Sequence, residues 1–278
     1  MYARGLESLQ RLVLPDNWQA RGIAALKVGR DVILDAPTGA GKTFVFEKFA
    51  ESTSFARPAI YTVPTRALAN DKYAEWKARG WKVGIVTGDL TVAPESPVVV
   101  ATLEAVQTQL REGGRWQFLA VDEYQWLGDS QRGNHYEGVL AALPRGVQLL
   151  LLSGSVANPD DVATWLRRLG RTVELIRHRE RPVPLEEVEV DDLTRGLPAE
   201  IQGFWTRRLA GALREGLGPV LVFAPQRQEA ERLARQFARE LPPPDPLALT
   251  PEQEQALGPS LTKLVRVRVA FHHSGLTY

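Results

Sequence analysis

Six short, uninterrupted apolar runs alternate with helix-like stretches between residues 30 and 152, and this alternation leaves few folds open to the chain. The runs occupy residues 32–36, 59–63, 83–86, 98–101, 118–121 and 148–152. A continuous apolar run of strand length is typical of a strand buried on both faces of a parallel sheet. Helical stretches lie between the runs, at residues 42–50, 66–78 and 103–111. The pattern predicts a doubly wound α/β domain with right-handed crossovers.

The sequence changes in character at residues 177–184, which are charged and punctuated by proline and are typical of a linker. After it we expect an extended stretch at 185–190, a helix at 201–215, a strand at 220–224 and a helix at 228–239. These elements predict the start of a second α/β domain. A chain of 278 residues fits roughly two domains, if a domain has about 150 residues. We therefore divide it into residues 1–178 and 179–278.

Composition excludes several kinds of protein. The net charge of +1 does not indicate nucleic-acid binding by bulk charge, so any such contact must come from local groups. The absence of cysteine excludes disulfides and thiolate metal sites and is typical of a reducing compartment. No apolar run approaches the roughly 20 residues that span a bilayer. We expect a cytoplasmic protein without a membrane partner.

A phosphate-binding loop follows the first apolar run. The residues Ala36-Pro37-Thr38-Gly39-Ala40-Gly41-Lys42-Thr43 match the P-loop pattern, except that Ala36 replaces a glycine. The glycines allow backbone amides to turn toward phosphate oxygens, and the following helix adds its positive dipole end. Lys42 would bind the β- and γ-phosphates of ATP, and Thr43 would be a ligand of Mg²⁺. The alternative is a glycine turn followed by chance by Lys-Thr.

Two carboxylates end the apolar run at 118–121. Asp122 would hold Mg²⁺ through water, and Glu123 would orient the attacking water or accept its proton. The alternative is a strand end that carries two solvated carboxylates. Together with the P-loop, the pair predicts a catalytic nucleoside-triphosphate site.

Asp122-Glu123-Tyr124-Gln125 resembles the D-E-x-H/Q box of the superfamily-two DEAD/DEAH-box helicases. Other blocks follow that family's order, at residues 18–19, 63–69, 87–89, 101–104 and 220–225. Those at 152–166, 181–185 and 271–276 resemble its superkiller-like branch. The resemblance implies a RecA-like P-loop domain with a parallel sheet, followed by a second RecA-like α/β domain.

The resemblance also implies an ATP-dependent nucleic-acid helicase or translocase, with ATP and Mg²⁺ as cofactors and single-stranded DNA or RNA as partner. Gln19 would read the adenine, and Gln125 would join Lys42, Asp122 and Glu123 in catalysis. Ser153 and Ser155 would couple the nucleotide state to strand grip. The residues implied to contact the nucleic-acid backbone are Pro64, Thr65, Arg66, Thr87, Gly88 and Thr102. The alternatives are a surface helix glutamine for Gln19 and ordinary loop capping for the contact residues.

Three positions depart from the family pattern. Ser153-Gly154-Ser155 replaces Ser-Ala-Thr, which keeps the hydroxyls and is expected to loosen the backbone. Gln125 replaces the commoner histidine and cannot titrate. Leu103 stands where many members have proline.

The sequence ends at Tyr278, directly after the 271–276 block. The resemblance implies that the second domain continues to a Q-x-x-G-R-x-G-R block, so we expect that domain to be incomplete here and hydrolysis by these residues alone to be slow. An alternative is a truncated or split helicase-like protein that binds nucleotide or single-stranded nucleic acid without unwinding. A separate chain would then supply the missing motifs. A small-molecule P-loop kinase fits Lys42 but not the later blocks.

Overall fold

The computed structural model describes residues 14–112, 115–241, 245–273 and 276. Residues 274 and 275 of the predicted 271–276 block lie outside this part of the chain. The chain divides into two compact units, Met1–Leu185 and Glu186–Tyr278, which are described separately below. The sequence analysis placed the boundary after residue 178, whereas the first unit also takes in the residues up to Leu185.

The first unit contains one eight-stranded sheet in the order β4-β3-β5-β2-β6-β7-β1-β8. Its neighbouring strands are parallel except for the antiparallel pair β3 and β4. The six predicted strands are confirmed, and β4 and β8 were not predicted. The strands are β1 (Asp31–Asp35), β2 (Ala59–Val63), β3 (Val83–Val86), β4 (Thr91–Val92), β5 (Val98–Thr102), β6 (Phe118–Asp122), β7 (Gln148–Ser153) and β8 (Val173–Arg177).

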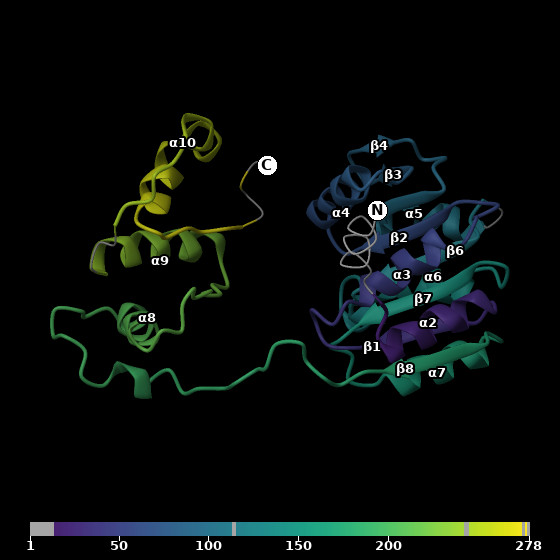
Figure 1. The fold of residues 1–278 in the computed structure, drawn as a ribbon, viewed down its shortest axis with the longest axis horizontal. Helices are drawn as coiled ribbons and strands as arrows, with labels where there is room; N and C mark the ends of the chain where they lie inside the picture. The colour runs from purple at the N-terminus through teal and green to yellow at the C-terminus, as the bar shows by residue number, and fades with distance from the viewer. Residues whose placement is uncertain (1–13, 113–114, 242–244, 274–275, 277–278) are drawn as a thin grey trace, which may run out of the picture. The chain divides into compact units, whose positions relative to one another are not determined.

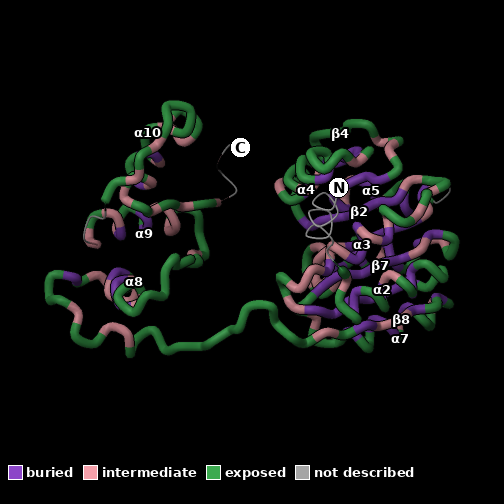
Figure 2. The backbone as a smooth tube through the Cα atoms, viewed as in Figure 1, coloured by how far each residue is buried: buried purple, intermediate pink, exposed green. Residues whose placement is uncertain are grey.

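Helices cover both faces of this sheet (Figure 1). One face packs against α2 (Asn17–Lys27), α3 (Lys42–Glu51) and α4 (Arg66–Ala78), and the other against α5 (Leu103–Glu112), α6 (Gly133–Ala142) and α7 (Pro159–Arg168). Within β1, Val32 and Leu34 belong to the first core and Ile33 to the second. Burial on both faces explains the uninterrupted apolar runs, and Figure 2 shows most strands as buried segments, whereas β4 is exposed.

A buried ion pair between Arg171 and Asp31 stabilises the amino-terminal edge of the sheet. Arg171 donates from one nitrogen to Asp31 Oδ2 at 2.9 Å and to the Val147 carbonyl at 3.2 Å. Its other terminal nitrogen donates to the Leu143 carbonyl at 2.9 Å. Asp31 Oδ1 accepts from the Leu149 amide at 2.7 Å, so the carboxylate joins the starts of β1 and β7. Both side chains are almost fully buried.

Arg171→Met is expected to lower the free energy of unfolding by about 3–5 kcal/mol, because it leaves a buried carboxylate without its counter-charge. Urea unfolding followed by circular dichroism measures the change. Arg168→Met, at an exposed position in the last turn of α7, is the matched control and should change stability by no more than about 0.5 kcal/mol. Equal, small effects of both substitutions would contradict the structural role given to the pair.

The second unit is helical over its described residues. It contains a short 3-10 helix, η2 (Asp192–Thr194), and helices α8 (Phe204–Arg214), α9 (Arg227–Glu240) and α10 (Pro251–Arg266). The predicted helices at 201–215 and 228–239 are confirmed as α8 and α9. In neither unit is any helix of the described residues long and apolar enough to cross a membrane.

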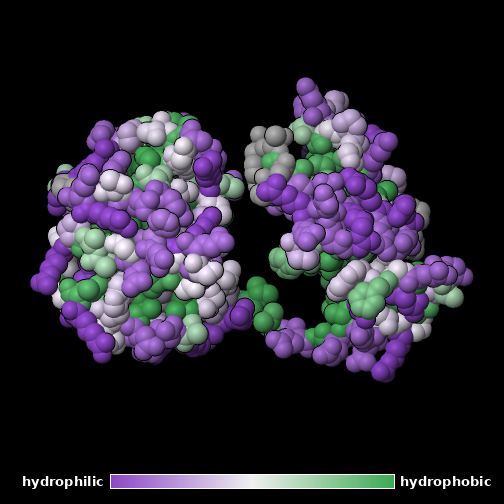
Figure 3. Space-filling model, turned by 180° about the vertical axis from the view of Figure 1, so that it is seen from behind, coloured by the Kyte–Doolittle hydropathy of each residue, from purple (hydrophilic) through white to green (hydrophobic). Residues whose placement is uncertain are grey.

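The strand predicted at residues 220–224 is wrong for the described structure. The segment has no secondary structure, and Leu221 and Phe223 are 77% and 87% exposed. A strand needs a hydrogen-bonded neighbour, and the described residues of this unit contain no other strand to supply one. Its apolar side chains therefore remain on the surface, and hydrophobic groups are visible on the face of the unit drawn in Figure 3.

Candidate nucleotide and nucleic-acid site

The P-loop joins the end of β1 to the start of α3. Gly39 and Gly41 have φ values of 83° and 85°, in the left-handed region that costs other residues energy. Gly41 is the N-cap of α3, and Lys42 is the first residue of that helix. The first turn of a helix leaves its amides without intrahelical partners, and its dipole favours negative charge there. This end of α3 therefore suits a phosphate group.

The Lys42 side chain folds back into the loop. Its ammonium donates to the carbonyls of Ala36 at 2.8 Å and Pro37 at 3.0 Å, and the residue is buried. Burial lowers the pKa of Lys42, and the nearby carboxylates of Glu123 and Asp122 oppose that shift. The positive charge thus lies between the loop and the acidic residues, where a phosphate oxygen would compete for it with the loop carbonyls.

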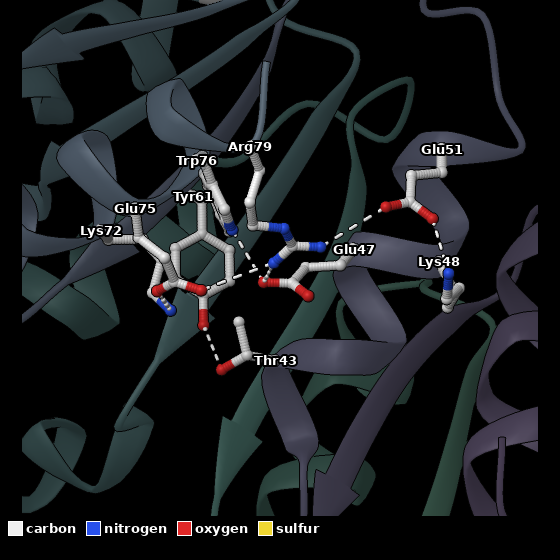
Figure 4. Close-up of polar contacts among 9 residues, drawn as sticks. All are labelled: Thr43, Glu47, Lys48, Glu51, Tyr61, Lys72, Glu75, Trp76 and Arg79. Atoms are coloured by element: carbon white, nitrogen blue, oxygen red, sulfur yellow. Dashed lines mark hydrogen bonds and ion pairs between the residues drawn. The ribbon is translucent and has the colours of Figure 1, made fainter. Parts of the chain in front are cut away.

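The two predicted magnesium ligands meet at one tyrosine. Tyr61, on β2, donates to Asp122 Oδ2 at 2.8 Å, and its hydroxyl oxygen lies 3.3 Å from Thr43 Oγ1 (Figure 4 draws the Thr43 contact). The Glu123 amide donates to Asp122 Oδ1 at 3.0 Å. Burial raises the pKa of Asp122, and the Tyr61 hydrogen bond opposes that shift. Hydroxyl and carboxylate oxygens are ligands that Mg²⁺ accepts, so Thr43 and Asp122 fit the metal.

Tyr61 was missed by the sequence analysis. A single tyrosine inside an apolar run is typical of the hydrophobic core. The sequence of the run at 59–63 does not indicate the direction in which the Tyr61 hydroxyl points. The available signal was the polar group itself, because a buried tyrosine hydroxyl usually finds a hydrogen-bond partner.

A chain of hydrogen bonds leads from Glu123 to the end of β7. Gln125 Nε2 donates to Glu123 Oε2 at 2.8 Å, and Ser153 Oγ donates to Gln125 Oε1 at 2.6 Å. The Ser155 amide in turn donates to Ser153 Oγ at 3.2 Å. Glu123 itself adopts a left-handed backbone with φ of 53°, which is uncommon outside glycine and concentrates at functional sites. The structure thus connects four of the predicted site residues, Glu123, Gln125, Ser153 and Ser155, the last through its backbone amide.

Gly154 lies against the start of the P-loop. A Cβ at this position would overlap the Ala36 carbonyl oxygen and lie 3.1 Å from Pro37 Cα. That same carbonyl accepts the Lys42 ammonium. The expected reason for the glycine was a looser backbone, but the structural reason is close approach: the missing side chain leaves room for the carbonyl that holds Lys42.

Gln19 lies beneath the P-loop. Its Nε2 donates to the carbonyls of Ala40 at 3.3 Å and Gly41 at 3.2 Å, and its Oε1 accepts from the Asp16 amide at 2.8 Å. The last bond belongs to the capping box of α2. The side chain therefore supports the loop, and the predicted adenine contact stays a prediction.

The start of the linker is held by α2 and by the end of β1, next to the P-loop. His178 stacks on Trp18 with ring centroids 5.1 Å apart, and its amide donates to the Asp35 carbonyl at 2.9 Å. Further along, the Pro182 ring lies 3.5 Å from the point where a Cβ on Gly39 would be. The chain thus passes directly over the P-loop as it leaves β8.

The six predicted nucleic-acid residues lie at the carboxyl ends of β2, β3 and β5, where Thr102 is the last residue of β5. Thr65, Arg66 and Gly88 are exposed, whereas Pro64, Thr87 and Thr102 are buried. Arg66 crosses Gly88 and pairs with Asp89 at 3.4 Å, while Thr65 caps α4 by accepting from the Leu68 amide at 3.3 Å. The exposed three are accessible on the surface, although Arg66 and Thr65 already have partners within the chain. The predicted contact of all six with nucleic acid stays a prediction.

Comparison with protein families matches residues 16–162 to the DEAD/DEAH box helicase model. The matched segment contains the P-loop, the Asp122-Glu123 pair and the Ser153–Ser155 block.

The similar curated proteins are far longer than this chain. The DExH-box ATP-dependent RNA helicase DExH15 of Arabidopsis thaliana chloroplasts is 34% identical over 183 residues, which cover 61% of this chain and 16% of that protein. Human superkiller complex protein 2 is 35% identical over 178 residues, which cover 62% of this chain and 14% of that protein. The ATP-dependent DNA helicase Hel308 of Pyrococcus abyssi is 30% identical over 301 residues, which cover 98% of this chain and 40% of that protein.

Among solved structures, the crystal structure of the DUF1998 helicase MrfA bound to DNA has a similar fold. The match has a TM-score of 0.60 and 18% identity, and it covers 80% of this chain and 36% of the other. At this identity the likeness establishes the fold alone.

Proposed function

Because the chain belongs to the DEAD/DEAH box helicase family, we propose that it is the ATP-binding part of a motor that hydrolyses ATP and moves along single-stranded DNA or RNA. One observation carries the proposal. Thr43, in the first turn of α3, and Asp122, at the end of β6, both contact the hydroxyl of Tyr61 on β2, and Lys42 is the residue before Thr43. This meeting of the P-loop helix with the end of β6 supports a nucleoside-triphosphate site at the carboxyl edge of the sheet.

In this proposal, Lys42 and the amides of the P-loop bind the β- and γ-phosphates, and Thr43 and Asp122 hold Mg²⁺. Bound Mg²⁺ offsets the charge of the phosphate oxygens. Glu123 orients the attacking water and takes its proton, and the Gln125 amide fixes the Glu123 carboxylate for that task. The products are ADP and phosphate. Arginines of a complete second RecA-like domain, implied by the sequence resemblance, would stabilise the transition state, so we propose slow hydrolysis without them.

Ser153 supplies the proposed link between hydrolysis and strand grip. Its hydroxyl donates to Gln125, which is bonded to Glu123, and it accepts from the amide of the exposed Ser155. A change at the γ-phosphate that moves Glu123 would therefore be passed along this chain to the surface beyond β7.

Strand binding is proposed for the exposed group that contains Thr65, Arg66 and Gly88. An arginine, a hydroxyl and a glycine backbone suit contact with phosphates without regard to base sequence. The relatives' names include an RNA helicase and a DNA helicase, so both polymers are candidates for this chain.

Arg66→Ala is expected to weaken binding of single-stranded DNA or RNA about 10- to 100-fold, because a charged hydrogen bond to phosphate contributes roughly 1.5–3 kcal/mol. The slope of log affinity against log salt should also fall by about 0.7 for the one lost phosphate contact. Fluorescence anisotropy of labelled oligonucleotides over a salt series measures both quantities.

Arg30→Ala is the matched control. Arg30 is also an exposed arginine paired with a carboxylate, Glu174, but it lies at the opposite edge of the sheet, before β1. It should change neither affinity nor slope. If Arg66→Ala behaves like Arg30→Ala, the proposed strand-binding edge is wrong.

A further inference from the structure

The hydrogen bonds around Tyr61 have a fixed direction. The Tyr61 hydroxyl has one proton, and it is donated to Asp122 Oδ2 at 2.8 Å. An ionised carboxylate can only accept, so this proton is not available to Thr43. The 3.3 Å contact between the two hydroxyls must therefore be donated by Thr43 Oγ1 to Tyr61 Oη. With its proton directed at Tyr61, the Thr43 oxygen keeps both lone pairs for other partners.

The Tyr61 ring has little freedom to move. It is fully buried between Phe46, at a ring-centroid distance of 4.9 Å, and Trp76, at 5.1 Å. Trp76 is itself fixed, because its Nε1 donates to Glu47 Oε1 at 2.7 Å. Arg79 pairs with the same Glu47 oxygen at 2.9 Å (Figure 4). The Tyr61 ring is thus packed between a residue of α3 and a residue of α4, and this packing fixes the position of its hydroxyl.

We propose that Tyr61 is a positioning residue for the metal, an inference that rests on the proposed ATP–Mg²⁺ site. Its hydroxyl oxygen accepts the hydrogen bond of Thr43, which turns a lone pair of the Thr43 oxygen toward the metal position, and it fixes the Asp122 carboxylate by donating to Oδ2. Tyr61 does not itself bind the metal or the nucleotide. It sets the orientation of both protein ligands before Mg²⁺ arrives.

Removal of this hydroxyl has a specific consequence. In Tyr61→Phe, the Thr43 hydroxyl loses the acceptor that fixes its direction and can rotate. The Asp122 carboxylate loses one of the two hydrogen bonds that orient it. Loss of partners that orient metal ligands typically lowers metal affinity 10- to 100-fold. The P-loop contacts of Lys42 do not involve Tyr61, so binding of nucleotide without metal should persist.

The test is a titration of a fluorescent ATP analogue with the protein, in EDTA and over a series of free Mg²⁺ concentrations. Tyr61→Phe should raise the Mg²⁺ midpoint by about 10-fold or more, leave affinity in EDTA unchanged, and recover wild-type affinity at excess Mg²⁺. Tyr136→Phe is the matched control, because Tyr136 is equally buried but lies on α6, against the other face of the sheet. It should leave the midpoint unchanged.

A double substitution separates positioning from packing. In a Thr43→Val background the Thr43 contact is already gone, so Tyr61→Phe should shift the midpoint less than it does alone. An unchanged midpoint in Tyr61→Phe, or an equal loss of affinity with and without Mg²⁺, would overturn the proposal while leaving the proposed function intact. If the affinity of the wild-type protein does not depend on Mg²⁺, the proposed function and the role of Tyr61 both fail.

Discussion

Lys42→Ala is expected to lower the affinity for ATP about 10- to 100-fold. The substitution removes a charged donor that would bind the β- and γ-phosphates, and a charged hydrogen bond contributes roughly 1.5–3 kcal/mol. It also removes the group that the carbonyls of Ala36 and Pro37 now hold inside the loop. Those carbonyls would then face the phosphates with no positive charge between them, which adds repulsion to the lost attraction.

Isothermal titration calorimetry with a non-hydrolysable ATP analogue measures this loss. Lys48→Ala is the matched control, since Lys48 lies on the same helix but is partly exposed, pairs with Glu51 and lies over the Phe44 ring. Thermal unfolding without nucleotide shows whether the variants remain folded. Equal affinities of wild type and Lys42→Ala would remove the case for a phosphate site at this loop.

Glu123→Gln is expected to lower the rate of ATP hydrolysis by about 10²- to 10⁴-fold and to leave ATP affinity unchanged. Glutamine keeps the size of the side chain, and its oxygen can still accept from Gln125 Nε2. It cannot take a proton from water at neutral pH. The loss should therefore appear mainly in turnover, because the Glu123 carboxylate is hydrogen-bonded to Gln125 and acts on Lys42 through its charge.

Phosphate release measured with and without a single strand gives the rate, and calorimetry gives the affinity. Glu137→Gln, an exposed carboxylate on α6, is the control for the chemical change and should hydrolyse at the wild-type rate. Wild-type turnover in Glu123→Gln would show that another group activates the water.

Most of the first unit could be predicted because its strands are buried on both faces. The runs at 59–63 and 83–86 coincide with β2 and β3, and the helix at 66–78 coincides with α4. The helicase family was also predicted and is confirmed by the match over residues 16–162. β8 escaped prediction because it is an edge strand whose Glu174 and Arg177 interrupt the apolar pattern.

The second unit shows the limit of the same reasoning. Residues 220–224 have the composition of a strand, but composition cannot supply the neighbour that a strand must pair with. Helices α8 and α9 were predictable, because a helix forms its backbone hydrogen bonds within itself.

At the site, the sequence pattern identified residue types but not their contacts. It predicted that Thr43 and Asp122 act together, because Thr43 closes the P-loop pattern and Asp122 directly follows the apolar run at 118–121. It could not show that Tyr61 joins them, or that Gly154 is needed where two loops touch, since both facts depend on strand register and on backbone distances between segments remote in sequence. A sequence motif predicts which residues form the site, whereas the packing of the fold determines how each side chain is oriented.

The passage of the linker over the P-loop has a mechanical consequence. The stacking of His178 on Trp18 and the position of Pro182 beside Gly39 make the first residues after β8 part of the nucleotide-binding unit. A displacement of the linker at Pro182 would therefore act on Gly39 of the P-loop, while His178 stays joined to β1 through the Asp35 carbonyl.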